Sequence, residues 1–104
     1  MKIFIVGLGL IGASFAEGLK QQGHLVYGYD HDQQTMDEAL RLQVIQKESS
    51  LNDIGGTSLV ILALYPLDNI KFMKANQHRF IEGQVITDVS GTKTHMMDDL
   101  LPLI

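Results

Sequence analysis

Short apolar runs alternate along this chain with segments in which apolar residues recur every three or four positions. The runs are rich in Val, Ile and Leu, which is typical of strands buried on both faces of a sheet. Four strands are predicted in this way: residues 2–6, 25–29, 59–64 and 84–89. The segments with helical spacing predict four helices: residues 10–22, 33–42, 67–80 and 94–101. Gly23 stands where a C-terminal cap of the first helix would be. Residues 44–46 predict a very short edge strand, and residues 49–58 a connection or a short helix.

This alternation of strands and helices predicts an α/β fold. We expect a doubly wound, mainly parallel sheet with helices on both faces and right-handed crossovers. The chain has 104 residues, of which 45% are hydrophobic, and this suffices for one core of ordinary size. Residues 1–104 are therefore expected to form one domain.

Three glycines follow the first predicted strand in the stretch GLGLIG. Gly7 allows a sharp turn out of the strand, Gly9 lets a pyrophosphate approach the backbone, and Gly12 lets the helix pack closely on the sheet. The phosphates would rest on the free N–H groups at the start of the helix, where the dipole favours anions. This order predicts a Rossmann-type dinucleotide-binding domain, although the glycines would also suit simple turns and packing.

An acidic residue, Asp30, ends the second predicted strand. Its carboxylate can accept hydrogen bonds from the adenosine ribose hydroxyls. Because a carboxylate repels a 2′-phosphate, and no Arg or Lys occurs between Asp30 and Met36, we expect NAD rather than NADP as the cofactor. His31 could contact a phosphate when protonated, and is otherwise an exposed loop residue.

Two further strand ends should face the same crevice, because ligands gather at the carboxyl ends of parallel strands. Leu64 and Tyr65 could lie along the ribose, or could form an ordinary strand-to-helix turn. After the last strand, Ser90 and Gly91 could line the nicotinamide end, or Asp88 and Ser90 could cap the following helix. The predicted cofactor-binding residues are Gly7, Leu8, Gly9, Leu10, Ile11, Gly12, Asp30, His31, Leu64, Tyr65, Pro66, Ser90 and Gly91.

Composition narrows the choice of function. The formal net charge is -4 and the 8 basic residues are scattered, so the chain offers no cationic face for nucleic acid. It has no cysteine, which suits a reducing cytoplasm, and its 4 histidines lack a metal-ligand spacing. The apolar start could also be a secretory signal, but it lacks an A-x-A cleavage pattern. We expect a cytoplasmic protein with a small-molecule substrate and no metal or membrane partner.

The segments GLGLIGASFAEGL, GYD, VILALYP and ITDVSGTK resemble, in this order, the amino-terminal domain of the prephenate dehydrogenase family, which includes arogenate dehydrogenases. The resemblance covers essentially the whole chain. It implies an NAD-dependent oxidoreductase of tyrosine biosynthesis that oxidatively decarboxylates prephenate or arogenate. In this family the residues that match Gly7, Gly9, Gly12 and Asp30 hold the dinucleotide, and the turn after the last strand lies near the nicotinamide and the substrate.

The last turn departs from the family pattern. The resemblance offers Ser90 as the catalytic candidate, but the family usually places glycine before serine there, whereas this chain has Ser90 before Gly91, so the serine's catalytic role does not transfer directly. The family's catalytic histidine, in a His-Pro motif, and its helical substrate and dimerisation domain would lie beyond Ile104. His95 is not in that context. We therefore expect this chain to be the cofactor half of a longer, homodimeric enzyme and to be inactive alone.

Two other functions stay open at the level of sequence. A nucleotide-sensing domain of a potassium transport system also begins with a strand, GxGxxG and a strand-end acid, but has no need of a Ser-Gly-Thr-Lys turn. Another β-hydroxyacid dehydrogenase is disfavoured by Leu10 and Ile11, because those enzymes typically carry a methionine before the third glycine. The sequence does not distinguish prephenate from arogenate as the substrate.

Overall fold

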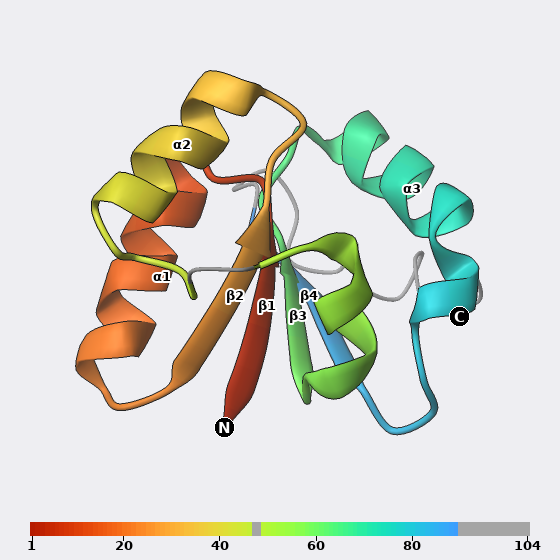
Figure 1. Cartoon of the computed structure of the whole chain (residues 1–104). Helices are drawn as coiled ribbons and strands as arrows, with labels where there is room; N and C mark the ends of the chain where they lie inside the picture. Colours follow the sequence, from red (N-terminus) through yellow and green to blue (C-terminus); the bar gives the residue numbers. More distant parts are fainter. Residues whose placement is uncertain (47–48, 90–104) are drawn as a thin grey trace.

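A computed structural model describes residues 1–46 and 49–89, and its strands form one parallel sheet in the order β2-β1-β3-β4. The strands are β1 (Lys2–Val6), β2 (Leu25–Tyr29), β3 (Leu59–Leu62) and β4 (Val85–Asp88). All four strands predicted from the apolar runs are present, although β3 and β4 are shorter than predicted. The carboxyl ends of the strands lie at the same edge of the sheet (Figure 1).

Helices cover both faces of the sheet, as the alternating pattern predicts. The helices of the described ranges are α1 (Leu10–Gln21), α2 (Gln33–Arg41), α3 (Pro66–Ala75) and the 3₁₀-helices η1 (Leu51–Gly56) and η2 (Gln77–Arg79). Figure 1 shows α1 and α2 on one side of the sheet and α3 on the other. The fold is therefore a Rossmann-like α/β domain. No helix in the described part of the chain is both long and apolar enough to cross a membrane.

Alternate residues of β1 supply two separate cores. Ile3 and Ile5 belong to the core under α1 and α2, whereas Phe4 and Val6 belong to the core on the α3 side. These four side chains are at most 1% exposed. A strand buried on both faces must be apolar throughout, which is why the run at the start of the chain lacks the alternation of a half-exposed strand.

Both α1 and α2 end in the same hydrogen-bonded turn, a Schellman motif, which places one residue in the left-handed region. At the end of α1 this residue is the predicted Gly23, with a φ of 92°, and the His24 N–H bonds to the carbonyl of Leu19. At the end of α2 it is Gln43, with a φ of 59°. The Val44 N–H completes the second motif.

Two sequence predictions need correction, and a third is not tested. Residues 44–46 do not form a strand, because the chain leaves α2 through the left-handed turn and only the Gln46 N–H bonds to β2, at the carbonyl of Val26. The helix predicted over 67–80 begins at Pro66 and stops at Ala75, where a short 3₁₀-helix replaces its last turn. The helix predicted over 94–101 lies outside the described residues.

Candidate functional site

The glycine turn after β1 is shaped by close backbone contacts. Gly7 has a φ of 94°, and a Cβ there would lie 3.0 Å from the carbonyl oxygen of Ala63. A Cβ on Gly12 would lie only 1.8 Å from the carbonyl oxygen of Gly7. Real Cβ atoms do not approach backbone so closely, and the left-handed conformation favours glycine at the first position. Gly7 and Gly12 are therefore required by the fold itself.

Gly9 differs from the other two glycines of the motif. It is the N-cap of α1, its backbone is extended, and no heavy atom lies within 4 Å of the place where its Cβ would be. No side chain caps this helix, so the first N–H groups of α1 have no side-chain acceptor. The open space beside Gly9 and the helix dipole together suit an anion such as a pyrophosphate.

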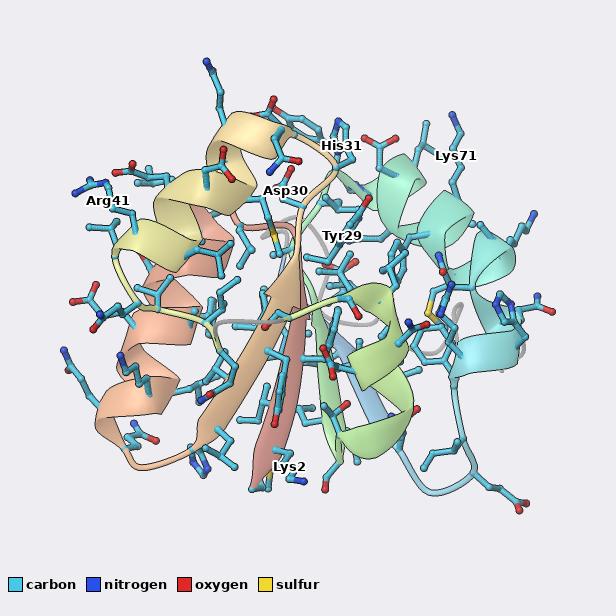
Figure 2. All side chains as sticks on the ribbon, viewed as in Figure 1. Lys2, Tyr29, Asp30, His31, Arg41 and Lys71 are labelled. Carbon is cyan, nitrogen blue, oxygen red and sulfur yellow. The ribbon has the colours of Figure 1, made fainter. Side chains whose placement is uncertain are left out.

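Asp30 lies at the carboxyl end of β2, and its side chain is only 10% exposed. Its Oδ2 accepts a hydrogen bond from the Leu8 N–H at 2.8 Å, and its Oδ1 accepts one from the Asp32 N–H at 2.9 Å. Each carboxylate oxygen has a second lone pair that can accept a further hydrogen bond. Asp30 thus ties the glycine turn to β2 and is also placed to accept a hydroxyl. Figure 2 shows Asp30 and His31 at the carboxyl edge of the sheet, opposite Lys2.

These elements surround a hollow of about 430 Å³ at the carboxyl ends of β1 and β3. The two strands lead to helices on opposite faces, and such a switch point is where α/β sheets bind ligands. The volume falls within the usual range of small-molecule sites. The hollow is lined by Gly7, Gly9, Leu10, Ile11, Asp30, His31, Ala63, Leu64, Tyr65 and Asp68.

Most of the predicted cofactor-binding residues thus meet in one place. Leu8 is an exception, because its side chain is 3% exposed in the α1 core and only its N–H reaches Asp30. Gly12 lies on the buried face of α1, and Pro66 is the first residue of α3 rather than part of the lining. Ser90 and Gly91 lie outside the described residues.

Sequence reasoning missed three residues at this edge, namely Ala63, Asp68 and Asn69. Ala63 and Asp68 line the hollow, and Asn69 is fully buried beside it. The small residue before the strand-end turn was a usable signal, since Gly7 packs directly against Ala63. Nothing in the local pattern separates Asp68 and Asn69 from ordinary polar residues of a helix start.

The charge of the hollow is mainly acidic. Asp30 and Asp68 both line it, and no Lys or Arg is among its lining residues. His31 is 84% exposed, and its Nδ1 lies 3.7 Å from an oxygen of Asp30. Next to the hollow, the hydroxyl of Thr35 and then its N–H donate to Asp32 and lower the pKa of that carboxyl.

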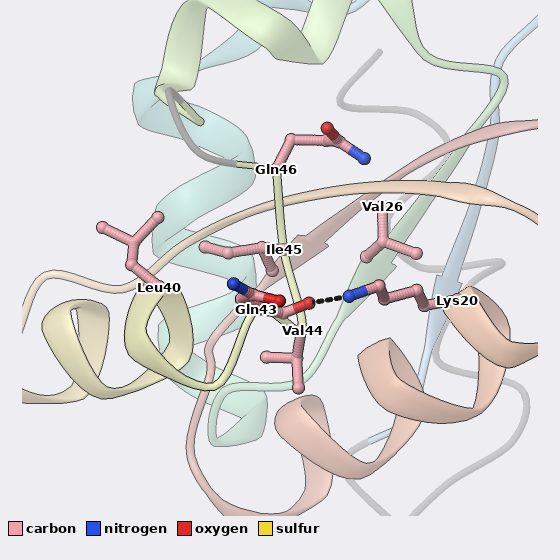
Figure 3. Close-up of a pocket in the computed structure, with 7 residues that line it drawn as sticks. All are labelled: Lys20, Val26, Leu40, Gln43, Val44, Ile45 and Gln46. Atoms are coloured by element: carbon pink, nitrogen blue, oxygen red, sulfur yellow. Dashed lines mark hydrogen bonds between the residues drawn. The ribbon is translucent and has the colours of Figure 1, made fainter.

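A second hollow, of about 380 Å³, lies at the other end of the α1 and α2 pair, between these helices and residues 44–46 (Figure 3). Its polar contact is the bond from Lys20 Nζ to the carbonyl of Gln43, and most of the remaining lining is aliphatic. The Lys20 ammonium closes a helix end there, so this hollow belongs to the packing of the domain. Within the described residues, no group of three or more His, Cys, Asp and Glu could hold a metal ion.

The fold and the glycine turn define a nucleotide-binding domain of the Rossmann class. Residues 15–104 match the family described as prephenate dehydrogenase, nucleotide-binding domain. This match spans most of the chain, and the chain therefore belongs to that family. A comparison with curated proteins found no match.

Solved structures with the same fold include two from this group of enzymes. An arogenate dehydrogenase from Synechocystis is 27% identical, with a TM-score of 0.83 over 97% of this chain and 38% of that chain. A prephenate dehydrogenase from A. aeolicus, in complex with hydroxyphenyl propionate and NAD+, is 25% identical, with a TM-score of 0.78 over 97% of this chain and 38% of that chain. The present chain thus spans 38% of the length of these two proteins.

A third solved structure is more distant. A 3-hydroxyisobutyrate dehydrogenase from Mycobacterium tuberculosis is 20% identical, with a TM-score of 0.71 over 84% of this chain and 30% of that chain. At this identity the likeness shows a shared fold and nothing of the reaction.

Proposed function

We propose that this chain is the NAD-binding domain of a prephenate or arogenate dehydrogenase, an enzyme that oxidatively decarboxylates its substrate toward tyrosine. Membership of the prephenate dehydrogenase family supports the proposal, and so does the likeness to a prephenate dehydrogenase solved with NAD+. The family match includes residues 88–93, whose Ser-Gly-Thr-Lys segment a nucleotide sensor would not need. It therefore favours a dehydrogenase over a sensor.

The uncapped start of α1, next to the buried carboxylate of Asp30, is the observation that carries the proposal. The two features lie at the carboxyl edge of the sheet and contribute to the same hollow. In our proposal the N–H groups of Leu10, Ile11 and Gly12 bind the pyrophosphate, and Gly9 leaves space for it. Asp30 accepts hydrogen bonds from the adenosine ribose.

The same geometry favours NAD over NADP. A 2′-phosphate placed near Asp30 would meet a carboxylate that is largely shielded from water, where repulsion between like charges is strong. Asp68 adds a second negative charge to the lining, and the lining contains no Lys or Arg to neutralise a phosphate. The exposed His31 is the one imidazole among the lining residues.

In the proposed reaction the domain contributes binding and orientation. When bound, NAD supplies the hydride acceptor for the oxidation. The strand ends hold the dinucleotide against the sheet, and Asp30 fixes its adenosine end. We propose that the proton acceptor for the substrate hydroxyl comes from elsewhere in a longer, homodimeric enzyme, because the family resemblance implies a catalytic histidine in a His-Pro motif and this sequence contains no such motif.

Calorimetric titration of the purified chain with NAD and with NADP tests this function. We expect measurable binding of NAD and at least about tenfold weaker binding of NADP, since one unfavourable charge contact of this kind is worth about 1.4 kcal/mol or more. Equal or tighter binding of NADP would contradict the role assigned to Asp30. Binding of neither nucleotide would overturn the proposed function.

A further inference from the structure

Asn69, in the first turn of α3, is the most deeply buried polar side chain in the described part of the chain, with an exposure of 0%. It lies at the carboxyl edge of the sheet but does not line the hollow. A buried amide is stable only when its donors and acceptor are satisfied, because an unpaired polar group in the interior is costly. Its partners therefore show what this residue holds in place.

Two of these partners belong to the backbone of Leu64. The Leu64 N–H donates to Asn69 Oδ1 at 3.0 Å, and Asn69 Nδ2 donates to the carbonyl of Leu64 at 3.2 Å. β3 ends at Leu62, so Leu64 lies beyond the regular strand pairing. The amide of Asn69 thus replaces a strand partner and fixes the backbone at one wall of the hollow.

Leu64 in turn contacts the glycine turn. Its Cδ2 would lie 2.9 Å from a Cβ built on Gly7, so the side chain packs closely over that residue. The wall fixed by Asn69 therefore sets the position of the Gly7 turn, from which α1 and its anion-binding N–H groups follow.

The third partner is the carboxylate of Asp88, at the end of β4. Asn69 Nδ2 donates to Asp88 Oδ2 at 2.8 Å, across 19 positions of sequence. The two hydrogens of the amide then serve Leu64 and Asp88, while Oδ1 serves the Leu64 N–H. Asp lacks both donors, and Ser is too short to reach three partners, so neither residue can replace the amide of Asn69.

We propose that Asn69 is a positioning residue that couples the end of β4 to the nucleotide site. The coupling runs through a series of contacts, from Asp88 to Asn69, from Asn69 to Leu64, and from Leu64 to Gly7. This inference rests on the proposed function, because the property it predicts is the affinity for NAD. In this inference the contact between Asn69 and Asp88 helps to hold the Leu64 wall of the hollow. Breaking this contact should therefore weaken NAD binding in a chain that still folds.

The test uses Asn69→Asp in the full chain, with the dissociation constant for NAD measured by calorimetry at pH 5.5 and at pH 8. The new carboxyl would face Asp88 within hydrogen-bond distance, and two carboxylates so close share one proton. The new group's pKa is therefore raised above its unfolded value, so the contact persists at low pH and is lost as the pH rises through the folded pKa. At each pH the NAD affinity of Asn69→Asp is divided by that of the unaltered chain. We expect this ratio to be about tenfold lower at pH 8 than at pH 5.5.

Two further variants separate coupling from a general loss of stability. Asn76→Asp is the matched control: Asn76 is also buried, at 8% exposure, but lies at the far end of α3, where it accepts a bond from Arg79. It should leave NAD affinity unchanged at both pH values, whatever its melting temperature. The double variant Asn69→Asp with Asp88→Asn restores a donor and acceptor pair, and should remove the pH dependence.

If Asn69→Asp melts below the temperature of the titration at pH 8, Asn69→Ser replaces it. The serine hydroxyl can still serve the Leu64 N–H but does not reach Asp88, and we expect about tenfold weaker NAD binding at both pH values. Affinity at pH 8 equal to that of the unaltered chain in either variant, or the same pH effect in Asn76→Asp, would overturn the inference and leave the proposed function intact. An unaltered chain that binds no NAD would instead overturn the proposed function, and the inference with it.

Discussion

Neighbouring glycines in one short motif are required for different reasons. The backbone leaves no room for a side chain at Gly12, whereas the space beside Gly9 is open. Packing therefore does not require glycine at the second position, and the proposed pyrophosphate site gives a reason for it. The two residues can be tested with the same substitution, because one serves packing and the other serves the proposed pyrophosphate site.

Gly9→Val should fold and lose nucleotide binding, because its side chain would occupy the space that the pyrophosphate needs. Gly12→Val should lower the melting temperature, because overpacking of this kind typically costs about 1 to 3 kcal/mol of stability. In a domain of this size, each kcal/mol lost lowers the melting temperature by about 4 to 8 °C. Thermal melts and NAD titrations of both variants check this. Normal binding by Gly9→Val would place the cofactor elsewhere, and an unchanged melt of Gly12→Val would contradict the packing.

Asp30 combines a structural and a proposed binding role, and two substitutions distinguish them. Asp30→Asn keeps an acceptor for the Leu8 N–H but removes the charge and the acceptor for the Asp32 N–H, so we expect it to narrow the preference for NAD over NADP and to lower the melting temperature less than Asp30→Ala does. Asp30→Ala also releases the glycine turn, and it should weaken NAD binding by about 1 to 3 kcal/mol and lower the melting temperature. Titration with both nucleotides, beside a thermal melt, measures these effects. If Asp30→Asn keeps the full preference, another group must discriminate.

At the scale of elements, α1 and α2 end in the same motif but differ in the residue that carries the positive φ. Gly23 adopts φ of 92° without a side chain, whereas Gln43 adopts φ of 59° with one. The left-handed region costs a non-glycine residue about 1 to 2 kcal/mol. The end of α2 is thus a strained position that the Lys20 contact to the Gln43 carbonyl helps to hold.

Gln43→Gly should stabilise the domain by about 0.5 to 1 kcal/mol, because relief of the left-handed strain exceeds the added freedom of the unfolded chain. The Lys20 contact uses the backbone carbonyl and survives the change. Gly23→Ala is the matched reverse: nothing lies within 4 Å of its Cβ position, so a loss of stability there would come from φ alone. Melting temperatures of both variants measure the effect, and a lower value for Gln43→Gly would contradict it.

Prediction from sequence worked best where one physical rule decided the outcome. The buried strands and the Gly23 end of α1 follow from local composition, and both were predicted. Residues 44–46 were wrongly predicted as a strand, because an apolar run of this length does not show whether it pairs or merely packs. Asn69 was missed for a different reason: its partners Leu64 and Asp88 are joined only by the folded chain, and a polar residue in a helix start usually faces water.

At the scale of the molecule, the chain is 104 residues long and its match covers 38% of the solved arogenate dehydrogenase. Oxidation of the substrate needs a proton acceptor within hydrogen-bond reach of the hydroxyl, and groups that hold the ring against the nicotinamide. In the described residues, Asp30 and Asp88 are held by backbone or amide partners. We therefore expect the described residues to serve binding rather than the complete reaction.

We expect the chain alone to bind NAD without oxidising prephenate or arogenate. The measurement is the absorbance of reduced cofactor after the chain is mixed with NAD and each substrate. A rate near that of an ordinary enzyme, about 10 per second, would contradict this expectation. In that case the catalytic group lies within these residues, and Ser90 and His95 would be the first to mutate.

The central position of β1 has a consequence for the order in which the chain is made. β1 leaves the ribosome before its neighbours, and α1 follows soon enough to cover one face. Its other face, with Phe4 and Val6, packs against Ile54 and Met73, which are synthesised much later. Until α3 has emerged, a nascent chain therefore carries an uncovered apolar strand face of the kind that binds chaperones or aggregates. Slow translation before α3 would lengthen this exposed period.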